Sequence, residues 1–356
     1  MLTSKERVLK AVNHEIGDRT PITFDAEQEV YDMLYNKLNL NTKEELLQHL
    51  HVDTRMILPK NFLYPEEEMS KRVKQSIWGW KAELTEYTGG AYDELSWSPL
   101  ADSDDISDID ELDFPDSEDL DFSHYPREIE KHSDKAIIGV FTWGAYFLAT
   151  HIRGLQQLLM DFALNQKYAE HLIGRIADRS CQILDDMLEK YGDGIDIVYM
   201  ADDYCSQRSP LFSPQDFKRF VVPYLTRIVD KVHQAGKKFL LHVCGAVRPL
   251  LPHIVDAGVD MLEPIQTRAK GMNPEELKRE FGDDLCFYGG LDLQQILADG
   301  SQDDVANETK RLIDILGKNG GYVFGPGHTY IQIDAPFENI MTMYRTAYNY
   351  RPHSQK

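Results

Sequence analysis

Residues 237–245 read Lys-Lys-Phe-Leu-Leu-His-Val-Cys-Gly, an apolar run that ends in two side chains able to bind a metal ion. The run predicts a buried β-strand, and the final glycine lets the chain turn at the strand's carboxyl end. Residues i and i+2 of a strand point to the same side, so His242 and Cys244 project together. Alone, such a pair is weak evidence for metal binding, because buried cysteines are often inert.

Two further strand-like runs end in residues of the same kind. Residues 259–264 read Val-Asp-Met-Leu-Glu-Pro, and residues 320–328 read Gly-Gly-Tyr-Val-Phe-Gly-Pro-Gly-His. Instead of binding a metal, Glu263 could be a carboxylate satisfied within the core or the ion-pair partner of Arg268. His328 could be an ordinary loop residue. Because these strands belong to one repeating pattern, we expect their carboxyl ends to converge. The four side chains expected to share a zinc ion are His242, Cys244, Glu263 and His328.

Short apolar strands alternate with helical stretches from about residue 135 onward. The strands are expected at 136–141, 196–200, 238–243, 259–263, 285–288 and 321–324. The helices are expected through about 190, after Ser213-Pro214, at 247–257, from Asn273-Pro274, at 293–298 with 302–318, and at 336–349. Repeated strand–helix units indicate parallel strands.

Two further short strands near the N-terminus, at 21–24 and 52–58, bring the count to eight. The sequence therefore predicts an α/β fold, a (β/α)8 TIM-like barrel with an N-terminal extension. An open doubly wound sheet is the alternative, but no Gly-x-Gly-x-x-Gly turn follows the first strand. Residues 1–356 are expected to form a single barrel domain.

Residues 1–130 are expected to contribute N-terminal helices, a hairpin-like insertion and an acidic connector to that domain. Helices are predicted at 4–14 and 27–50, and an aromatic hairpin at 77–100 with its turn at Gly89-Gly90. Residues 101–121 then hold eleven acidic side chains and no basic one. We interpret this segment as a solvated connector, and a docking strip for a basic partner protein is the alternative.

The bulk composition limits the function classes. The net charge of −21 argues against a nucleic-acid partner, which needs a basic face. No apolar run approaches the roughly 18–20 residues of a membrane helix, so no membrane association is expected. The first residues read as a helix start and not as a signal peptide, and four cysteines without a disulfide spacing fit a reducing cytoplasm. The oligomeric state, including a homo-oligomer, stays open.

Other strand ends carry further candidates, because catalytic residues of barrels lie there. Asp202 and Asp203 follow a strand, and we expect them to orient a metal-bound histidine or to hold a substrate. Capping of the next helix is the alternative. Trp143 and Tyr204 are candidates for an aromatic substrate pocket, with core packing as the alternative.

Several segments together resemble a known family. They are 241–249 (Leu-His-Val-Cys-Gly-Ala-Val-Arg-Pro), 257–260 (Ala-Gly-Val-Asp), 288–294 (Tyr-Gly-Gly-Leu-Asp-Leu-Gln) and 336–340 (Pro-Phe-Glu-Asn-Ile). They are similar to the uroporphyrinogen decarboxylase superfamily, and more closely to its methyltransferase branch, whose enzymes move methyl groups to or from a corrinoid protein.

The resemblance implies roles for individual residues. It implies zinc bound by His242 and Cys244, with His328 at the place of a later ligand that is commonly a cysteine. Glu263 matches in spacing a glutamate of the related cobalamin-independent methionine synthases. Gln207 and Asp292 are implied as substrate contacts by the resemblance alone, and a helix N-cap is the alternative for Asp292.

The expected function is zinc-dependent methyl transfer between a small-molecule donor, for example a methoxylated aromatic, and a corrinoid protein. Its catalytic residues are expected to be His242, Cys244, Asp202 and Asp203. One alternative is methyl transfer from a methylcorrinoid to a thiol or tetrahydrofolate. A decarboxylase is another, although residues 19–25 hold only one arginine. A non-catalytic zinc-binding protein is the last.

Overall fold

The computed structural model describes residues 2–87 and 90–352, and parallel strands form its centre. Each strand is hydrogen-bonded to the next in an unbroken series. Their order is β1 (Thr54–Ile57), β5 (Ala136–Val140), β6 (Ile197–Ala201), β7 (Lys238–His242), β8 (Met261–Glu263), β9 (Cys286–Tyr288) and β10 (Tyr322–Val323).

Residues 21–24 close the ring between β10 and β1. The Thr23 N–H donates to the Phe324 carbonyl, and the Asp53 N–H, just before β1, donates to the Ile22 carbonyl. Pro21 has no N–H to donate, and the segment pairs through a single parallel bridge instead of a full strand. With this segment the ring has eight positions, and the predicted (β/α)8 TIM-like barrel is confirmed.

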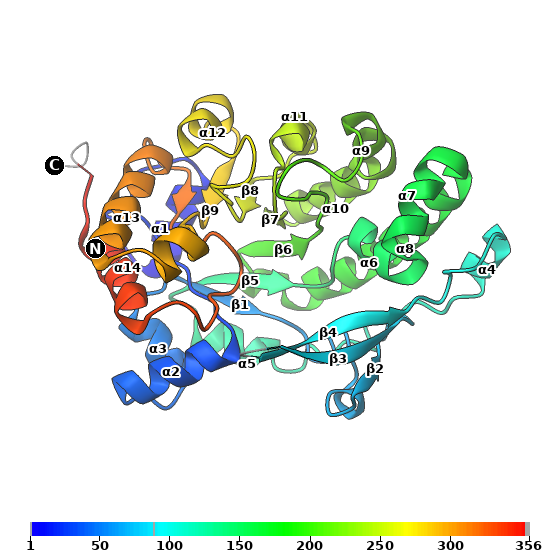
Figure 1. The fold of residues 1–356 in the computed structure, drawn as a ribbon, viewed down its shortest axis with the longest axis horizontal. Helices are drawn as coiled ribbons and strands as arrows, with labels where there is room; N and C mark the ends of the chain where they lie inside the picture. The colour runs from blue at the N-terminus through cyan, green and yellow to red at the C-terminus, as the bar shows by residue number, and fades with distance from the viewer. Residues whose placement is uncertain (1, 88–89, 353–356) are drawn as a thin grey trace.

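Helices follow the strands and cover the outside of the sheet (Figure 1). They are α6 (Ala145–Arg153), α7 (Leu155–Leu164), α8 (Gln166–Tyr191), α9 (Pro214–Phe220), α10 (Val222–Gln234), α11 (Leu251–Asp256), α12 (Pro274–Phe281), the π-helical turn η4 (Leu293–Ala298), α13 (Gln302–Leu316) and α14 (Phe337–Asn349). Ser213 and Asn273 cap α9 and α12 through their side chains, as their sequence positions predict.

The first helix, α1 (Ser4–Val12), plugs the amino-terminal end of the barrel. Thr3 and Glu6 form a capping box at its start. Val8 and Val12 join the buried cluster of side chains inside the barrel, which includes Ile138. The opposite, carboxyl ends of the strands are left to form the mouth, where this fold places its chemistry.

The predicted helix at 27–50 is wrong as one element. It forms α2 (Gln28–Leu38) and α3 (Lys43–His49). Asn39 adopts a left-handed conformation with φ of 54°, which ends α2, and Thr42 then caps α3.

The predicted hairpin forms a small antiparallel sheet of β2 (Val73–Gln75), β3 (Lys81–Tyr87) and β4 (Gly90–Trp97). In Figure 1 its β3 and β4 strands run along the lower side of the barrel, below β1 and β5. Gly90 opens β4, and Gly89, the other half of the predicted turn, lies outside the described residues.

The acidic segment contributes apolar side chains to the core. It contains α4 (Ile106–Asp110) and leads to α5 (Tyr125–Lys131), and Ile109, Phe114 and Leu120 are buried. The carboxylate of Asp110 pairs with two residues of α8, at 2.9 Å from His171 and 3.2 Å from Arg175. The acidic side chains face water, as the interpretation as a solvated connector expects, while the buried apolar ones anchor the segment.

All four cysteines are free, and Cys181 and Cys286 are buried in the core. Within the described ranges, no helix has the length and apolar character needed to cross a membrane.

Candidate metal centre

His242 and Cys244 lie together at the carboxyl end of β7. The Nε2 atom of His242 is 3.4 Å from the Sγ atom of Cys244. Asp203, in the loop after β6, brings its Oδ1 atom to 3.7 Å from the same Nε2 atom. This Oδ1 also accepts the backbone N–H of Cys244 at 2.8 Å, which ties the two loops together. Three possible ligand atoms, from three residue types, thus face one point.

Glu263 lies on the other side of the imidazole. Glu263 and His242 are register partners on neighbouring strands, and Oε2 of Glu263 is 2.9 Å from Nδ1 of His242. Because an ionised carboxylate only accepts hydrogen bonds, it favours the tautomer with the proton on Nδ1. Nε2 then faces Cys244 and Asp203, where a bound metal ion would take the place of its proton. The alternative pairing of Glu263 with Arg268 does not form, because Arg268 is 3.7 Å from Asp292 instead.

Thr329 supports this pair. Its Oγ1 atom donates to Oε1 of Glu263 at 3.3 Å and lies 3.2 Å from Nδ1 of His242. The segment after β10 therefore contributes to the site through two consecutive residues, since His328 also reaches it.

His328 contacts the thiol. Its imidazole is close enough to Cys244 for the thiol to raise the pKa of His328, and its Nδ1 atom accepts the Tyr330 backbone N–H at 3.4 Å. The compact group whose ligand atoms all lie within 4.8 Å of one another consists of Asp203, His242 and Cys244. His328 borders this group through the sulfur atom.

The charges at the site favour an ionised thiol. Burial acts to raise the pKa of Cys244, but hydrogen bonds from His242 and His328 outweigh it and lower that pKa below its usual value. Burial likewise acts to lower the pKa of His242, but Glu263 and Cys244 raise it well above the ordinary value. An imidazole, a thiolate and a carboxylate make a donor set that suits zinc.

The distances provide a test of that fit. Ligand atoms bound tetrahedrally at 2.0–2.3 Å lie about 3.3–3.8 Å from one another. The separations of 3.4 Å and 3.7 Å around Nε2 fall in this range. These two separations suit a shared zinc ion, and the third pair, Asp203 Oδ1 and Cys244 Sγ, lies within 4.8 Å.

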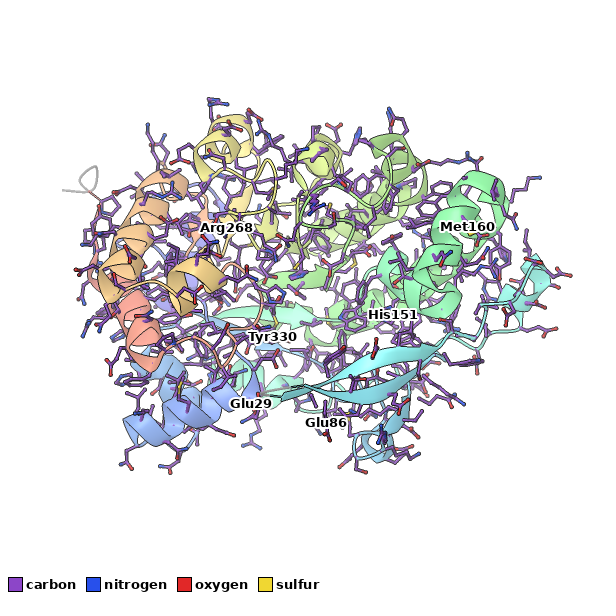
Figure 2. All side chains as sticks on the ribbon, viewed as in Figure 1. Glu29, Glu86, His151, Met160, Arg268 and Tyr330 are labelled. Carbon is purple, nitrogen blue, oxygen red and sulfur yellow. The ribbon has the colours of Figure 1, made fainter. Side chains whose placement is uncertain are left out.

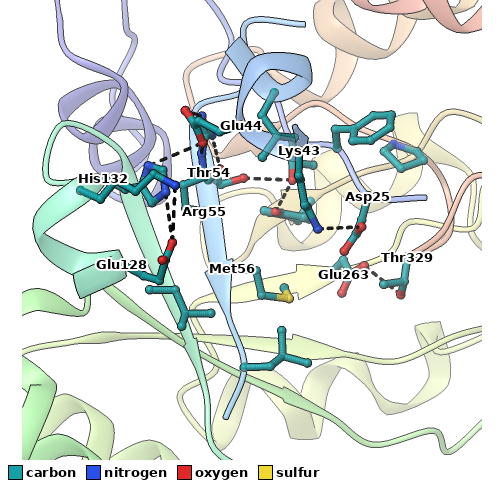
Figure 3. A pocket seen from close by; sticks show the side chains of 18 of the residues that line it. Asp25, Lys43, Glu44, Thr54, Arg55, Met56, Glu128, His132, Glu263 and Thr329 are labelled. Atoms are coloured by element: carbon teal, nitrogen blue, oxygen red, sulfur yellow. Dashed lines mark hydrogen bonds and ion pairs between the residues drawn. The ribbon is translucent and has the colours of Figure 1, made fainter. Parts of the chain in front are cut away.

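A cavity of about 310 Å³ opens on the Glu263 side of the site (Figure 3). Figure 3 shows Asp25, Glu263 and Thr329 at one end and an ionic cluster at the other. In that cluster Arg55 pairs with Glu44 at 2.9 Å. This cavity leads from the barrel mouth outward past β1.

A second cavity, of about 490 Å³, opens on the Cys244 side. Figure 2 labels two of its lining residues, Arg268 and Tyr330. The lining is mostly polar and includes Asp203, Gln207, Cys244, Gln266, Asp292, Gln294, His328 and Gln332. Two residues predicted as substrate contacts, Gln207 and Asp292, thus line the same cavity as Cys244, and Asp292 also caps η4 by accepting the Gln295 N–H at 3.1 Å. Because His328 lines both cavities, it separates them at the metal-ligand group.

Three other predicted residues lie outside these cavities. Asp202 is buried and accepts the Phe147 N–H at 2.7 Å, which caps α6, and the Tyr204 hydroxyl at 2.8 Å. Tyr204 is completely buried beside Phe217. Trp143 is half-buried and packs parallel to Trp80, with ring centroids 6.4 Å apart. Core packing thus describes Tyr204 and Trp143. Asp202 caps a helix, but the helix is α6 of the preceding unit and not the next helix, as the alternative expected.

Sequence reasoning missed two residues of the site. Thr329 follows His328 directly, and Gln266 follows Glu263 by three positions; the Gln266 amide nitrogen is 3.3 Å from the Cys244 sulfur. Their closeness to strand ends was an available signal.

A model of the family described as uroporphyrinogen decarboxylase (URO-D) matches residues 97–350. The uroporphyrinogen decarboxylase of Picosynechococcus sp. is 26% identical over 59% of this chain and 56% of its own length. The methylcobamide:CoM methyltransferase MtbA of Methanosarcina acetivorans is 24% identical over 58% of this chain and 57% of its own length.

A methylated-thiol–coenzyme M methyltransferase of Methanosarcina mazei is 26% identical over 43% of this chain and 37% of its own length. The chain thus spans about half the length of the curated relatives, or less.

A solved structure, a methyltransferase from Methanosarcina mazei, covers 98% of both chains with a TM-score of 0.70 and 17% identity, and supports the fold. The family match covers more than half of the chain, including β7, β8 and β10 with every proposed ligand. The chain belongs to the uroporphyrinogen decarboxylase family.

Proposed function

We propose that this protein is a zinc-dependent methyltransferase that moves a methyl group between a small molecule and a corrinoid protein. The observation that carries the proposal is the meeting of His242 Nε2, Cys244 Sγ and Asp203 Oδ1 beside a polar cavity. Relatives described as methyltransferases that act on methylcobamide and on methylated thiols support the same chemistry.

In this proposal His242, Cys244 and Asp203 bind the zinc ion. Glu263 was predicted as a ligand, and we now assign it to orient the imidazole, because its carboxylate contacts the remote Nδ1 atom. We place His328 on the remaining side of this metal-ligand group, next to the Cys244 sulfur. One thiolate leaves the ion more electrophilic than several would.

Bound zinc would act as a Lewis acid on the heteroatom of a methyl donor, or would hold a thiol acceptor as thiolate. The chain itself supplies the position and the surroundings. The cavity beside Cys244 holds the small molecule, and its Gln294, Gln332 and Arg268 offer hydrogen bonds to a polar group. The aromatic side chains expected for a methoxylated aromatic donor, Trp143 and Tyr204, lie outside this cavity. A small polar methyl donor therefore fits this cavity better, as does the thiol acceptor of the alternative function.

Porphyrinogen decarboxylation is less well supported, although family relatives carry that name. Every lysine and arginine that lines either cavity already has a carboxylate partner within 4.0 Å; these cations are Lys43, Arg55, Lys131 and Arg268. Arg19, the single arginine expected near the N-terminus, is buried against Asp53. No cation in these cavities is spare for a substrate with several carboxylates.

The test combines metal analysis with a methyl-transfer assay. Wild-type protein purified without chelator should hold close to one zinc per chain, and His242→Ala and Cys244→Ala should lose most of it. Cys205→Ser serves as a thiol control that keeps the metal. Mixing with reduced or methylated corrinoid protein and candidate donors or thiols is read by corrinoid absorbance. Unchanged zinc content in both alanine variants, or no absorbance change with any pair, contradicts the proposal.

A further inference from the structure

The side chain of Gln266 joins three loops at the metal-ligand group. It lies in the loop after β8, and its Oε1 atom accepts the Gly245 backbone N–H at 2.9 Å. The same oxygen is paired with Nε2 of Gln207, from the loop after β6. On its other side, Nε2 of Gln266 lies 3.3 Å from Sγ of Cys244. The loops after β6, β7 and β8 thus meet at one amide.

The orientation of this amide is fixed by its neighbours. A backbone N–H only donates, so the atom of Gln266 that faces Gly245 must be the oxygen. The amide NH2 must then point at the Cys244 sulfur. Gly245 itself has φ of 93°, and a Cβ atom there would lie 2.4 Å from the Ser206 carbonyl oxygen, which keeps the donor N–H in place. The geometry therefore directs an N–H donor at the sulfur.

Such a donor has a defined effect on a metal thiolate. An N–H group that binds a thiolate stabilises the sulfur lone pairs and restricts the cysteine rotamer. The sulfur then gives less charge to a bound metal ion, which stays more electrophilic. Groups that contact metal ligands in this way commonly change metal affinity or activity by about 10- to 100-fold.

We propose that Gln266 is a positioning residue that donates to the Cys244 thiolate and thereby keeps the bound metal electrophilic, with Gln207 holding it in place. This inference rests on the proposed zinc site. It gives Gln207 a role different from the substrate contact that the sequence resemblance implied. Gln266 acts through Cys244 and needs no contact with the substrate.

Cobalt(II) replaces zinc as a spectroscopic probe in the test. Wild-type protein loaded with cobalt(II) should show a sulfur-to-cobalt charge-transfer band. Gln266→Met keeps the size of the side chain and removes the N–H donor, so the band should move to longer wavelength. The methyl-transfer rate with zinc should fall by about 10-fold. Gln294→Met, in the same cavity but without a contact to Cys244 in the described structure, should leave the band unchanged.

Gln207→Met is the second variant if Gln266→Met fails to fold. It keeps the Gly245 contact of Gln266 and should shift the band in the same direction by a smaller amount. A band at the wild-type position in both Gln266→Met and Gln207→Met overturns the role of Gln266 and leaves the metal site standing. Wild-type protein that binds cobalt(II) without any charge-transfer band overturns the metal site itself, and the inference with it.

Discussion

His242 and Glu263 lie opposite each other on adjacent parallel strands, and their Nδ1 and Oε2 atoms are 2.9 Å apart. Both side chains are more than 90% buried, so water does not compete for this contact. The pair sets which imidazole nitrogen faces Cys244. The local sequence identifies His242 as a possible ligand, but the contact with Glu263 determines which of its two nitrogens is available to a metal ion.

Glu263→Gln tests this relationship. The amide keeps the size of the side chain and loses the charge that favours a proton on Nδ1. We expect zinc affinity to fall by about 10-fold, measured by competition with a fluorescent chelator. Glu276→Gln, which alters a partly buried ion pair with Arg248 outside the metal-ligand group, is the control. Equal affinities for the two variants would show that Glu263 does not orient the ligand.

The turn after Cys244 needs glycine for two reasons, and a pair of alanine variants separates them. Gly245 and Gly236 both have positive φ, at 93° and 72°, but a Cβ atom would clash with the Ser206 carbonyl only at Gly245. We expect Gly236→Ala to lower the free energy of unfolding by about 1 kcal/mol and Gly245→Ala by distinctly more. Urea denaturation measures both. Similar losses would mean that the loops relax around the new methyl group.

Asp53 forms buried ion pairs at the position where residues 21–24 meet β1 and complete the barrel. It is completely buried, and its carboxylate contacts the guanidinium groups of Arg7 and Arg19 at 2.8 Å and 2.6 Å. Asp53→Ala leaves buried positive charge without a partner, and we expect a loss of about 3–5 kcal/mol in the free energy of unfolding. Asp185→Ala, which breaks the exposed pair with Lys231, should cost less than about 1 kcal/mol. A small effect at Asp53 would mean that water reaches the two arginines.

The barrel could be predicted from the sequence because its strands are short apolar runs with helices between them. The same local rule found His242 and Cys244, whose spacing of two residues already sets a common direction. The local pattern did not encode which side of the imidazole each carboxylate would take. Asp203 and Glu263 both end strands, and only the register between β7 and β8 places Glu263 at Nδ1.

Other differences have physical reasons of the same kind. The break at Asn39 depends on a left-handed residue that helical periodicity does not reveal. Asp202 caps α6 of the preceding unit, where Gly144 leaves room for its carboxylate, and this contact spans 55 residues of sequence. The contact of Gln266 with Cys244 could not be predicted from the sequence, because it depends on how three separate loops pack together.

His151 packs between the rings of Trp80 and Phe147, at centroid distances of 4.9 Å and 4.7 Å. Burial lowers the pKa of His151 below its ordinary value of 6.5. As the pH falls below about 6.5, the unfolded chain takes up a proton at this residue that the folded chain resists. The contribution of His151 to stability is therefore complete above that pH and is lost as the pH falls towards the folded pKa.

His151→Gln removes this titration and keeps a donor for the Phe147 carbonyl, which lies 2.9 Å from Nδ1 of His151. The difference in unfolding free energy between wild type and variant should be constant above pH 7. It should then change in favour of the variant as the pH falls below 6.5, by about 1.4 kcal/mol for each unit by which the pKa is lowered. Urea titrations at several pH values measure this difference in unfolding free energy. Other groups titrate equally in both proteins, so their contributions cancel. Parallel stability curves over the whole range would mean that water reaches the ring and that burial does not hold it neutral.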